Sequence, residues 1–182
     1  MSTNVLFLSA SDVDRALTRR AASAAVQEAF VVLSEGRAEV PLRTQMARAG
    51  DGAALFKPVH LPNRRRLGIK VVTVVPENRE RNLPTIQALV SVFDAETGRP
   101  EAVMDGEVLT AIRTGAASGV ATDLLARGDA SVVAVIGAGV QARRQVEAVC
   151  CVRTIREVLI FDADATRALQ LAEDLGDDLM IP

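Results

Sequence analysis

The sequence predicts an α/β protein in two parts. Residues 1–128 are expected to form an α+β part, and residue 129 begins the first half of a doubly wound parallel sheet. Three observations predict this division. The chain opens with helical apolar spacing, continues with short β-rich segments, and changes near residue 131 to buried strands that alternate with helical patterns. The length of 182 residues exceeds one typical domain of about 150 residues.

Composition and charge narrow the class of protein. With 49% apolar and 24% charged residues, the chain is typical of a globular protein rather than a disordered one. It contains no apolar run long enough to span a membrane, and a net charge of -2 offers no broad basic surface for nucleic acid. We therefore expect no membrane partner and no nucleic-acid partner.

The cysteines and the first residues indicate the compartment. Cys150 and Cys151 are adjacent, a spacing that rarely satisfies disulfide geometry, and Met1 to Ala10 lack the features of a signal peptide. A reduced, cytoplasmic location is expected. No cluster of His, Cys and carboxylate residues has the spacing of a metal site, so none is predicted.

The first predicted element is one helix over residues 9–36. Ser11 is its expected N-cap, with Asp14 three residues later in a capping-box pattern. Apolar residues recur at steps of three and four along this segment. Gly36 is the expected C-terminal stop.

A β-rich stretch follows. Asp51-Gly52 predicts a hairpin between a strand that ends near Ala47 and one that starts near Ala53. Asp105-Gly106 is expected to end the strands of this part. The remaining strands are predicted at Ile69–Val75, Thr85–Phe93 and Pro100–Met104.

A second long helix is predicted over residues 107–127. Its Ala111, Gly115 and Gly119 recur every four residues, which indicates either tight packing against another helix or a cofactor or substrate pressed on that face. After it, continuous apolar segments predict strands buried on both faces, as parallel strands are. These strands are expected at 132–136 and 158–161, with helices at 140–151 and 166–175.

The strongest motif is Gly-Ala-Gly-Val-Gln-Ala at residues 137–142, between a predicted strand and a predicted helix. In that context G-x-G-x-x-A is typical of a Rossmann dinucleotide site. Gly137 allows the turn, Gly139 lets a pyrophosphate approach, and Ala142 packs the helix on the sheet. Asp162 follows at the distance of a ribose-binding carboxylate and is not followed by Arg, which favours NAD over NADP. The alternative is a merely structural glycine turn.

Several charged residues have two interpretations. Lys70 lies in a β-branched run, so its side chain either faces solvent or is held in a cleft. For Arg43 and Arg113, the simplest interpretation is a position on the surface. For the arginines at 64–66, it is a loop exposed to solvent. For His60, the single histidine, a position in a loop or in the core is favoured over a catalytic role.

Two segments together resemble the ornithine cyclodeaminase/mu-crystallin family. They are Asp105-Gly106 with Leu109-Thr110-Ala111-Ile112-Arg113-Thr114-Gly115-Ala116, and Val135-Ile136-Gly137-Ala138-Gly139-Val140-Gln141-Ala142. The Lys70 strand and Thr85-Ile86-Gln87-Ala88 extend the resemblance along the chain.

The resemblance implies roles for individual residues. Substrate binding would fall to Arg43, Lys70 and Arg113, and Lys70 would be catalytic. An Arg fork and a Lys charge suit an amino-acid carboxylate, and a nearby cation helps keep the substrate amine neutral. Cofactor binding would fall to Thr85, Arg113, Thr114, Gly137, Gly139, Val140, Gln141 and Asp162.

It also implies an activity. The expected protein is an NAD-dependent enzyme of the ornithine cyclodeaminase type, with a small amino or imino acid as substrate. An alanine dehydrogenase or a ketimine or imine reductase is the enzyme alternative, and a non-catalytic mu-crystallin-like ligand-binding protein is the other. The first part would bind substrate and form a homodimer through its sheet. The family's acid/base carboxylate would lie beyond Pro182, so this chain looks like the front half of a longer protein and by itself is expected to be inactive.

Overall fold

The computed structural model describes residues 4–48 and 50–179, which form two compact units. Within the described residues, unit 1 comprises 4–16 and 30–110, and unit 2 comprises 17–29 and 111–179. Two helices, α2 (Arg19–Ser34) and α3 (Gly106–Leu125), run from one unit into the other. The domain division at residue 128, which follows the change in sequence pattern, stays a prediction.

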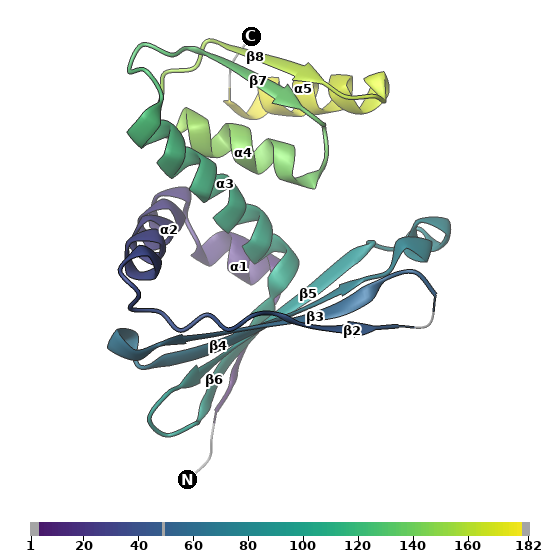
Figure 1. Ribbon diagram of the computed structural model, residues 1–182. Coiled ribbons are helices and arrows are strands. Elements are labelled where there is room, and N and C mark those ends of the chain that lie inside the picture. The colour runs from purple at the N-terminus through teal and green to yellow at the C-terminus, as the bar shows by residue number, and fades with distance from the viewer. Residues whose placement is uncertain (1–3, 49, 180–182) are drawn as a thin grey trace. The chain divides into compact units, whose positions relative to one another are not determined.

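Unit 1 is built on a six-stranded sheet in the order β1-β6-β5-β4-β3-β2 (Figure 1). Its strands are β1 (Leu6–Leu8), β2 (Thr44–Ala47), β3 (Ala53–Leu61), β4 (Arg66–Val74), β5 (Ile86–Asp94) and β6 (Pro100–Asp105). The pair β1–β6 is parallel and the other pairs are antiparallel. The sequence predicted all of these strands except the three-residue β1.

The predicted hairpin at Asp51-Gly52 is confirmed, because β2 and β3 pair antiparallel on either side of it. Gly52 has a φ of +124°, and a Cβ at this position would lie 2.1 Å from the carbonyl oxygen of Val74. Both the conformation and the close approach require glycine here. The hairpin thus depends on Gly52, which is part of the turn that the sequence predicts.

The expected single helix over residues 9–36 is wrong, because the structure has two helices there. Helix α1 spans Ala10–Ala16, and α2 begins at Arg19. Thr18 separates them: its Oγ1 accepts a hydrogen bond at 3.2 Å from the backbone N–H of Ala21, as an N-cap does. The apolar spacing continues through the break, which is why periodicity alone did not reveal it.

The N-cap of α1 is also two residues earlier than expected. Ser9, rather than Ser11, makes the capping box. The backbone N–H of Asp12 donates to Ser9 Oγ at 3.3 Å, and the N–H of Ser9 donates to Asp12 Oδ2 at 3.0 Å. At the other end, Gly36 adopts a φ of +68° just after α2 ends, as predicted.

Helix α3 begins directly on the sheet. Asp105, the last residue of β6, caps it by accepting a hydrogen bond at 2.8 Å from the N–H of Val108. A Cβ on Gly106 would lie 2.7 Å from Cβ of Ala88 on β5, so only glycine lets the helix start this close to the strand. The predicted Asp105-Gly106 boundary is confirmed, and it places the first turn of α3 over the middle of the sheet.

Unit 2 contains the predicted β-α-β-α order. It comprises the parallel strands β7 (Val132–Ile136) and β8 (Glu157–Phe161) and the helices α4 (Val140–Cys150) and α5 (Ala165–Leu179). Both helices pack on one face of the strand pair. The buried core between them consists of Ala142, Val146, Leu171 and Leu175, with Val135, Val158 and Ile160 packed against it.

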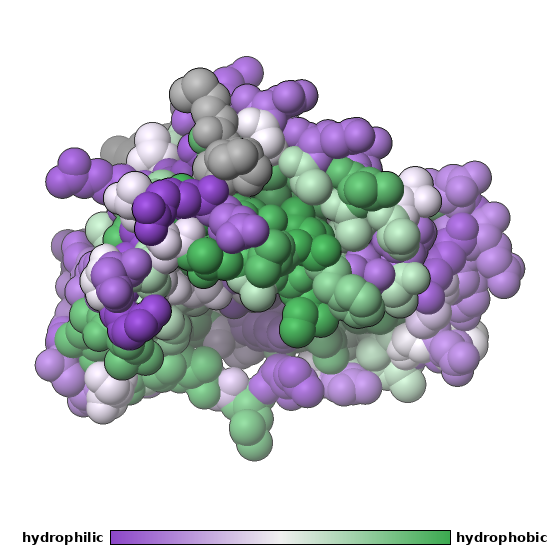
Figure 2. Space-filling view, turned by 90° about the horizontal axis from the view of Figure 1, so that it is seen from above, coloured by the Kyte–Doolittle hydropathy of each residue, from purple (hydrophilic) through white to green (hydrophobic). Residues whose placement is uncertain are grey.

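The expectation that these strands are buried on both faces is wrong for the described residues. Exposed and half-buried residues alternate along β7 and β8, because α4 and α5 cover only one face. Figure 2 looks onto the side where β7 and β8 lie and shows an apolar area with polar residues around it. The most exposed large side chains on this face are Ile136 at 88% and Phe161 at 67%.

The glycine spacing of α3 is explained by helix packing. A Cβ on Gly115 would lie 2.3 Å from the carbonyl oxygen of Arg144 on α4, and one on Gly119 would lie 3.0 Å from that of Ala148. The backbones of the two helices are therefore in contact, which confirms tight packing as the role of these glycines. Since Gly115 meets Arg144 and Gly119 meets Ala148, the two helices run in the same direction.

A buried carboxylate ties the unit-2 part of α2 to α4. Glu147 is 4% exposed and forms ion pairs with Arg19 at 3.3 Å and with Arg143 and Arg144 at 3.1 Å each. Burial raises the pKa of Glu147, but hydrogen bonds and charges from Arg19 and Arg144 lower it more, and the net shift is downward. The carboxylate is thus ionised at neutral pH and its charge is compensated.

Candidate functional site

Lys70 is positioned by the central strand β4. Its side chain is half-buried, and Nζ donates a hydrogen bond at 3.1 Å to Oγ1 of Thr110 in the first turns of α3. Of the two sequence interpretations, the structure therefore supports a held lysine rather than one that simply faces solvent. A half-buried ammonium with a fixed partner is a suitable group for binding an anion.

Other cations lie along the same row of the sheet. Lys57 on β3 is directly opposite Lys70, and directly opposite residues of an antiparallel pair project to the same face. The first pair of β2 and β3 is Thr44 with Phe56, so Arg43, one residue earlier, comes level with Lys57. Arg43 itself is exposed. With strands about 4.8 Å apart, the row spans roughly 10 Å from Arg43 to Lys70.

Thr85 is not brought to this row. It lies just before β5, where its carbonyl oxygen accepts a hydrogen bond at 2.8 Å from the N–H of Val75. Lys70 is paired with Val90, five residues further along β5, which corresponds to roughly 17 Å at the rise of an extended strand. Thr85 therefore lies away from this row, and its cofactor role stays a prediction.

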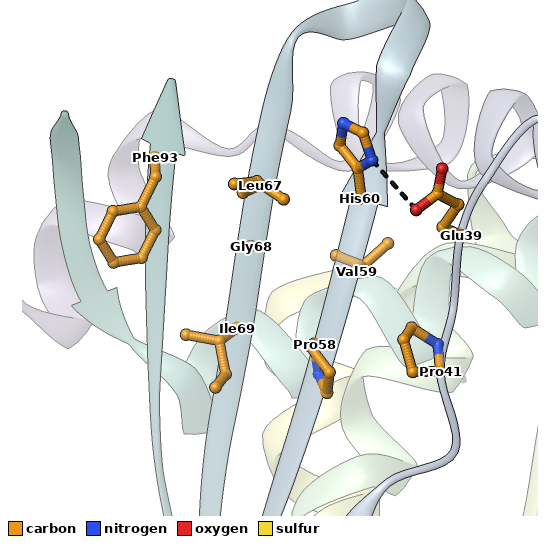
Figure 3. A pocket seen from close by; sticks show the side chains of 9 residues that line it. All are labelled: Glu39, Pro41, Pro58, Val59, His60, Leu67, Gly68, Ile69 and Phe93. Carbon is orange, nitrogen blue, oxygen red and sulfur yellow. Dashed lines mark ion pairs between the residues drawn. The ribbon is translucent and has the colours of Figure 1, made fainter. Parts of the chain in front are cut away.

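His60 lies on the other face of the sheet, in an apolar hollow of about 420 Å³ (Figure 3). Its Nδ1 is 3.3 Å from a carboxylate oxygen of Glu39, and the backbones of the two residues exchange hydrogen bonds. This pairing supports a structural role for His60. Apolar residues line the rest of the hollow, including Pro58, Leu67, Ile69 and Phe93.

The basic run at residues 64–66 forms ion pairs on the surface. Arg65 pairs with Glu96 at 2.5 Å, and Arg66 pairs with Glu101 at 3.2 Å. The three arginines are exposed around the turn between β3 and β4. The pairing supports the interpretation of this run as a solvated loop.

The glycine loop of unit 2 has the geometry that its motif predicts. Gly137 adopts a φ of +99°, and its backbone N–H donates at 2.7 Å to the carbonyl oxygen of Phe161 at the end of β8. Gly139 is the N-cap of α4 in an extended conformation. The N–H groups of the first turn, at exposed Val140 and Gln141, have no partner within the helix and carry the positive end of its dipole. This arrangement suits a phosphate.

Asp162, just after β8, contacts the glycine loop through its carboxylate. Its Oδ2 accepts a hydrogen bond at 2.6 Å from the N–H of Ala138, and its Oδ1 accepts one at 2.9 Å from the N–H of Asp164. These two backbone hydrogen bonds lower the pKa of Asp162 below its usual range, and the bond from Asp164 has the larger effect. The carboxylate is ionised at neutral pH and retains lone pairs that could accept ribose hydroxyl groups.

Arg113 and Thr114 lie on α3 just before Gly115. Because α3 and α4 run in the same direction from the Gly115–Arg144 contact, this part of α3 is on the side of the N-terminus of α4 and its glycine loop. Arg113 is exposed and Thr114 is half-buried. Both predicted cofactor residues are therefore level with the N-terminal part of α4, the end where the phosphate site would lie.

Comparisons with known proteins identify the family of the chain. The family model described as the ornithine cyclodeaminase/mu-crystallin family matches residues 3–179. The chain belongs to this family. A Δ1-pyrroline-2-carboxylate reductase from Bacillus cereus is 38% identical over 170 residues, which are 93% of this chain and 52% of that protein. The chain thus spans about half the length of the curated relatives it matches.

Solved structures of other members of the family also match. A Δ1-pyrroline-2-carboxylate reductase from Thermococcus litoralis, in complex with NADH and L-proline, matches with a TM-score of 0.91 and 42% identity. The match covers 97% of this chain and 55% of the reductase chain. An archaeal alanine dehydrogenase dimer with bound NAD has a TM-score of 0.89 and 36% identity, covering 95% and 53%. The α/β fold class predicted from the sequence is confirmed.

Among the described residues, no helix is long and apolar enough to cross a membrane.

Sequence reasoning did not assign three residues that the structure places at these sites. Thr110 holds Lys70, Lys57 lies beside Lys70, and Arg167 donates at 3.4 Å to the carbonyl oxygen of Ala138 in the glycine loop. Lys57 and Lys70 could be linked only once the register of β3 and β4 was known. Arg167 follows Asp162 by five residues, and the helical pattern over 166–175 had already placed it in a first turn.

Proposed function

We propose that the protein is an NAD(H)-dependent enzyme that interconverts a small α-imino carboxylate and the corresponding α-amino acid. The observation that carries this proposal is Lys70, a half-buried ammonium held by Thr110 in a row with two further cations. Such a row suits the substrate carboxylate. The similarity to a reductase that binds NADH and L-proline supports a cyclic imine as substrate.

The residues of unit 2 fit the cofactor. The turn at Gly137, the extended N-cap Gly139 and the first-turn N–H groups form a cradle for a pyrophosphate, and the ionised Asp162 suits the adenosine ribose. Val140, Gln141, Arg113 and Thr114 are the remaining candidates to hold the dinucleotide in this unit. When bound, the nicotinamide supplies the hydride transfer.

In this proposal the chain's own residues bind and orient the substrate. Lys70 and Arg43 hold the carboxylate by charge-assisted hydrogen bonds, and Thr110 keeps the ammonium of Lys70 directed to one place. Arg113 is proposed as a further substrate contact. A positive environment also lowers the pKa of a substrate amine, which favours the neutral form needed when an amino acid is oxidised.

The experiment is an assay of the full-length protein with NADH and Δ1-pyrroline-2-carboxylate. We expect NADH to be consumed in proportion to the amino acid formed. Calorimetric titration with NADH in the absence of substrate tests the cofactor separately. A protein that binds no NADH and consumes none with any small imino acid would contradict the proposal.

Cyclodeaminase activity is the second candidate, because it is the activity that the resemblance to the family implies. In that reaction the side-chain amine displaces ammonia from an imine and the cofactor is recycled. Ammonia released from a diamino acid without accumulation of NADH would identify it. A mu-crystallin-like binding protein would bind cofactor and ligand and show neither result.

The homodimer predicted from the family resemblance is proposed to form through the face of the sheet opposite Lys70. Register places Phe56, Ile69 and Phe93 on that face, together with Leu89, which is 47% exposed. Apolar areas of this kind on a soluble protein mark interaction sites. Similarity to an alanine dehydrogenase that is a dimer supports a second copy as the partner.

Changing Leu89 to Glu tests the dimer. We expect sedimentation at micromolar concentration to show a dimer for the wild type and a monomer for Leu89→Glu, since each copy would bury a charge in an apolar interface. Leu124→Glu is the matched control, because Leu124 is 66% exposed on α3 in unit 2. A stable wild-type monomer, or a Leu89→Glu protein that dimerises like the control, would contradict the proposal.

A further inference from the structure

Two opposite charges flank the same residue of the glycine loop. Ala138 donates its backbone N–H to Asp162 at 2.6 Å, and its carbonyl oxygen accepts a hydrogen bond from Arg167 at 3.4 Å. Arg167 lies in the first turn of α5, is exposed, and is 3.8 Å from the position of a Cβ on Gly139. Its charge also contributes to the low pKa of Asp162. The proposed ribose site therefore contains a carboxylate and a guanidinium that both hydrogen-bond to the backbone of Ala138.

We propose that Arg167 is a further cofactor-binding residue, and that the carboxylate of Asp162 keeps a 2′-phosphate out of this site although this cation lies beside the loop. This inference rests on the proposed function. It differs from the expectation drawn from the sequence, which considered only the residues immediately after Asp162, namely Ala163 and Asp164. On that basis the site had no cation for a 2′-phosphate, whereas the fold supplies one from α5.

The charges explain how the site would select its cofactor. With Asp162 ionised, a 2′-phosphate would meet a negative group at the position where a ribose hydroxyl donates a hydrogen bond. The charge of Arg167 then acts on the Asp162 carboxylate, whose pKa it helps to lower, and NAD is the cofactor that suits this pair. Without the carboxylate, the same guanidinium is left beside the loop with its fork of donors available, and such a fork suits phosphate oxygens.

The variants follow from this geometry. Asp162→Asn removes the charge but keeps an oxygen that can accept the hydrogen bond from Ala138, so the loop is expected to remain in place. Asp162→Ser is the second variant, in case the Asn protein does not fold. Asp162→Asn/Arg167→Ala then removes the cation as well. Arg156→Ala is the matched control, because Arg156 is an exposed arginine that contacts Ser131 just before β7, at the other end of the strands.

The experiment is calorimetric titration of each full-length variant with NADH and with NADPH, with circular dichroism to check folding. We expect Asp162→Asn to bind NADPH at least about tenfold more tightly than the wild type, the gain of one hydrogen bond to a charged group. The double variant should lose that gain. Arg167→Ala should weaken NADH binding several-fold relative to the wild type, and Arg156→Ala should bind NADH as the wild type does.

Two results would overturn the inference while leaving the proposed function intact. One is a double variant that binds NADPH as tightly as Asp162→Asn. The other is an Asp162→Asn protein, or its Ser equivalent, that is folded, binds NADH and gains no affinity for NADPH. A wild-type protein that binds no NADH would instead overturn the proposed function and this inference together.

Discussion

Replacing Lys70 with Met is expected to lower kcat/KM of the full-length protein by about 100-fold, which corresponds to the ~2.7 kcal/mol of one hydrogen bond to a charged group. Met keeps the apolar stem of the side chain, which is half-buried on β4, and removes only the ammonium that Thr110 holds. Steady-state kinetics with the imino acid and NADH provide the measurement. If the ammonium contributes mainly in the transition state, kcat and kcat/KM should fall together.

The control has to be chosen with the register in mind. Lys57 is the only other lysine, but it lies directly opposite Lys70 on the same face and is not a remote position. Arg99→Ala is the better control, because it removes an exposed cation in the turn between β5 and β6. Turnover of Lys70→Met within twofold of the Arg99→Ala protein would reassign the carboxylate contact to Arg113.

Much of this fold could be predicted because local signals and tertiary structure agree. The hairpin at Asp51-Gly52 and the start of α3 at Gly106 both occur where a glycine is required by close backbone contacts, and both had been predicted. The break at Thr18 was missed because the apolar spacing continues across it. The strand β1 was missed because three residues are too few to show a periodic pattern. It is a strand only because it pairs with β6 at the edge of the sheet, about 95 residues later in the chain.

The candidate sites show the same limit. Gly137, Gly139 and Asp162 could be found from the sequence because they are close along the chain and belong to one strand-turn-helix unit. The row of Arg43, Lys57 and Lys70 could not be found in this way. It depends on the register of three strands, and a shift of one residue in either pairing would move a cation to the other face.

Gly115 is where a single methyl group should have the largest effect on stability. The Cβ of an alanine would lie 2.3 Å from the carbonyl oxygen of Arg144 and 2.7 Å from its carbonyl carbon, both backbone atoms that cannot rotate away. Helices α3 and α4 would have to separate, and Ala148, which is buried on α4 opposite Gly119, would lose contacts. We expect Gly115→Ala to lower the free energy of unfolding by about 3 kcal/mol, and Gly115→Val by more.

Urea denaturation followed by circular dichroism measures this loss, with Gly128→Ala as the matched control. Gly128 follows α3, has an ordinary φ, and has nothing within 4 Å of the position of its Cβ. Its replacement should therefore be neutral or slightly stabilising, because alanine restricts the unfolded chain. Equal stability of the Gly115→Ala and Gly128→Ala proteins would mean that α3 and α4 are not in backbone contact. The position of Arg113 and Thr114 toward the glycine loop, which rests on that contact, would then be lost with it.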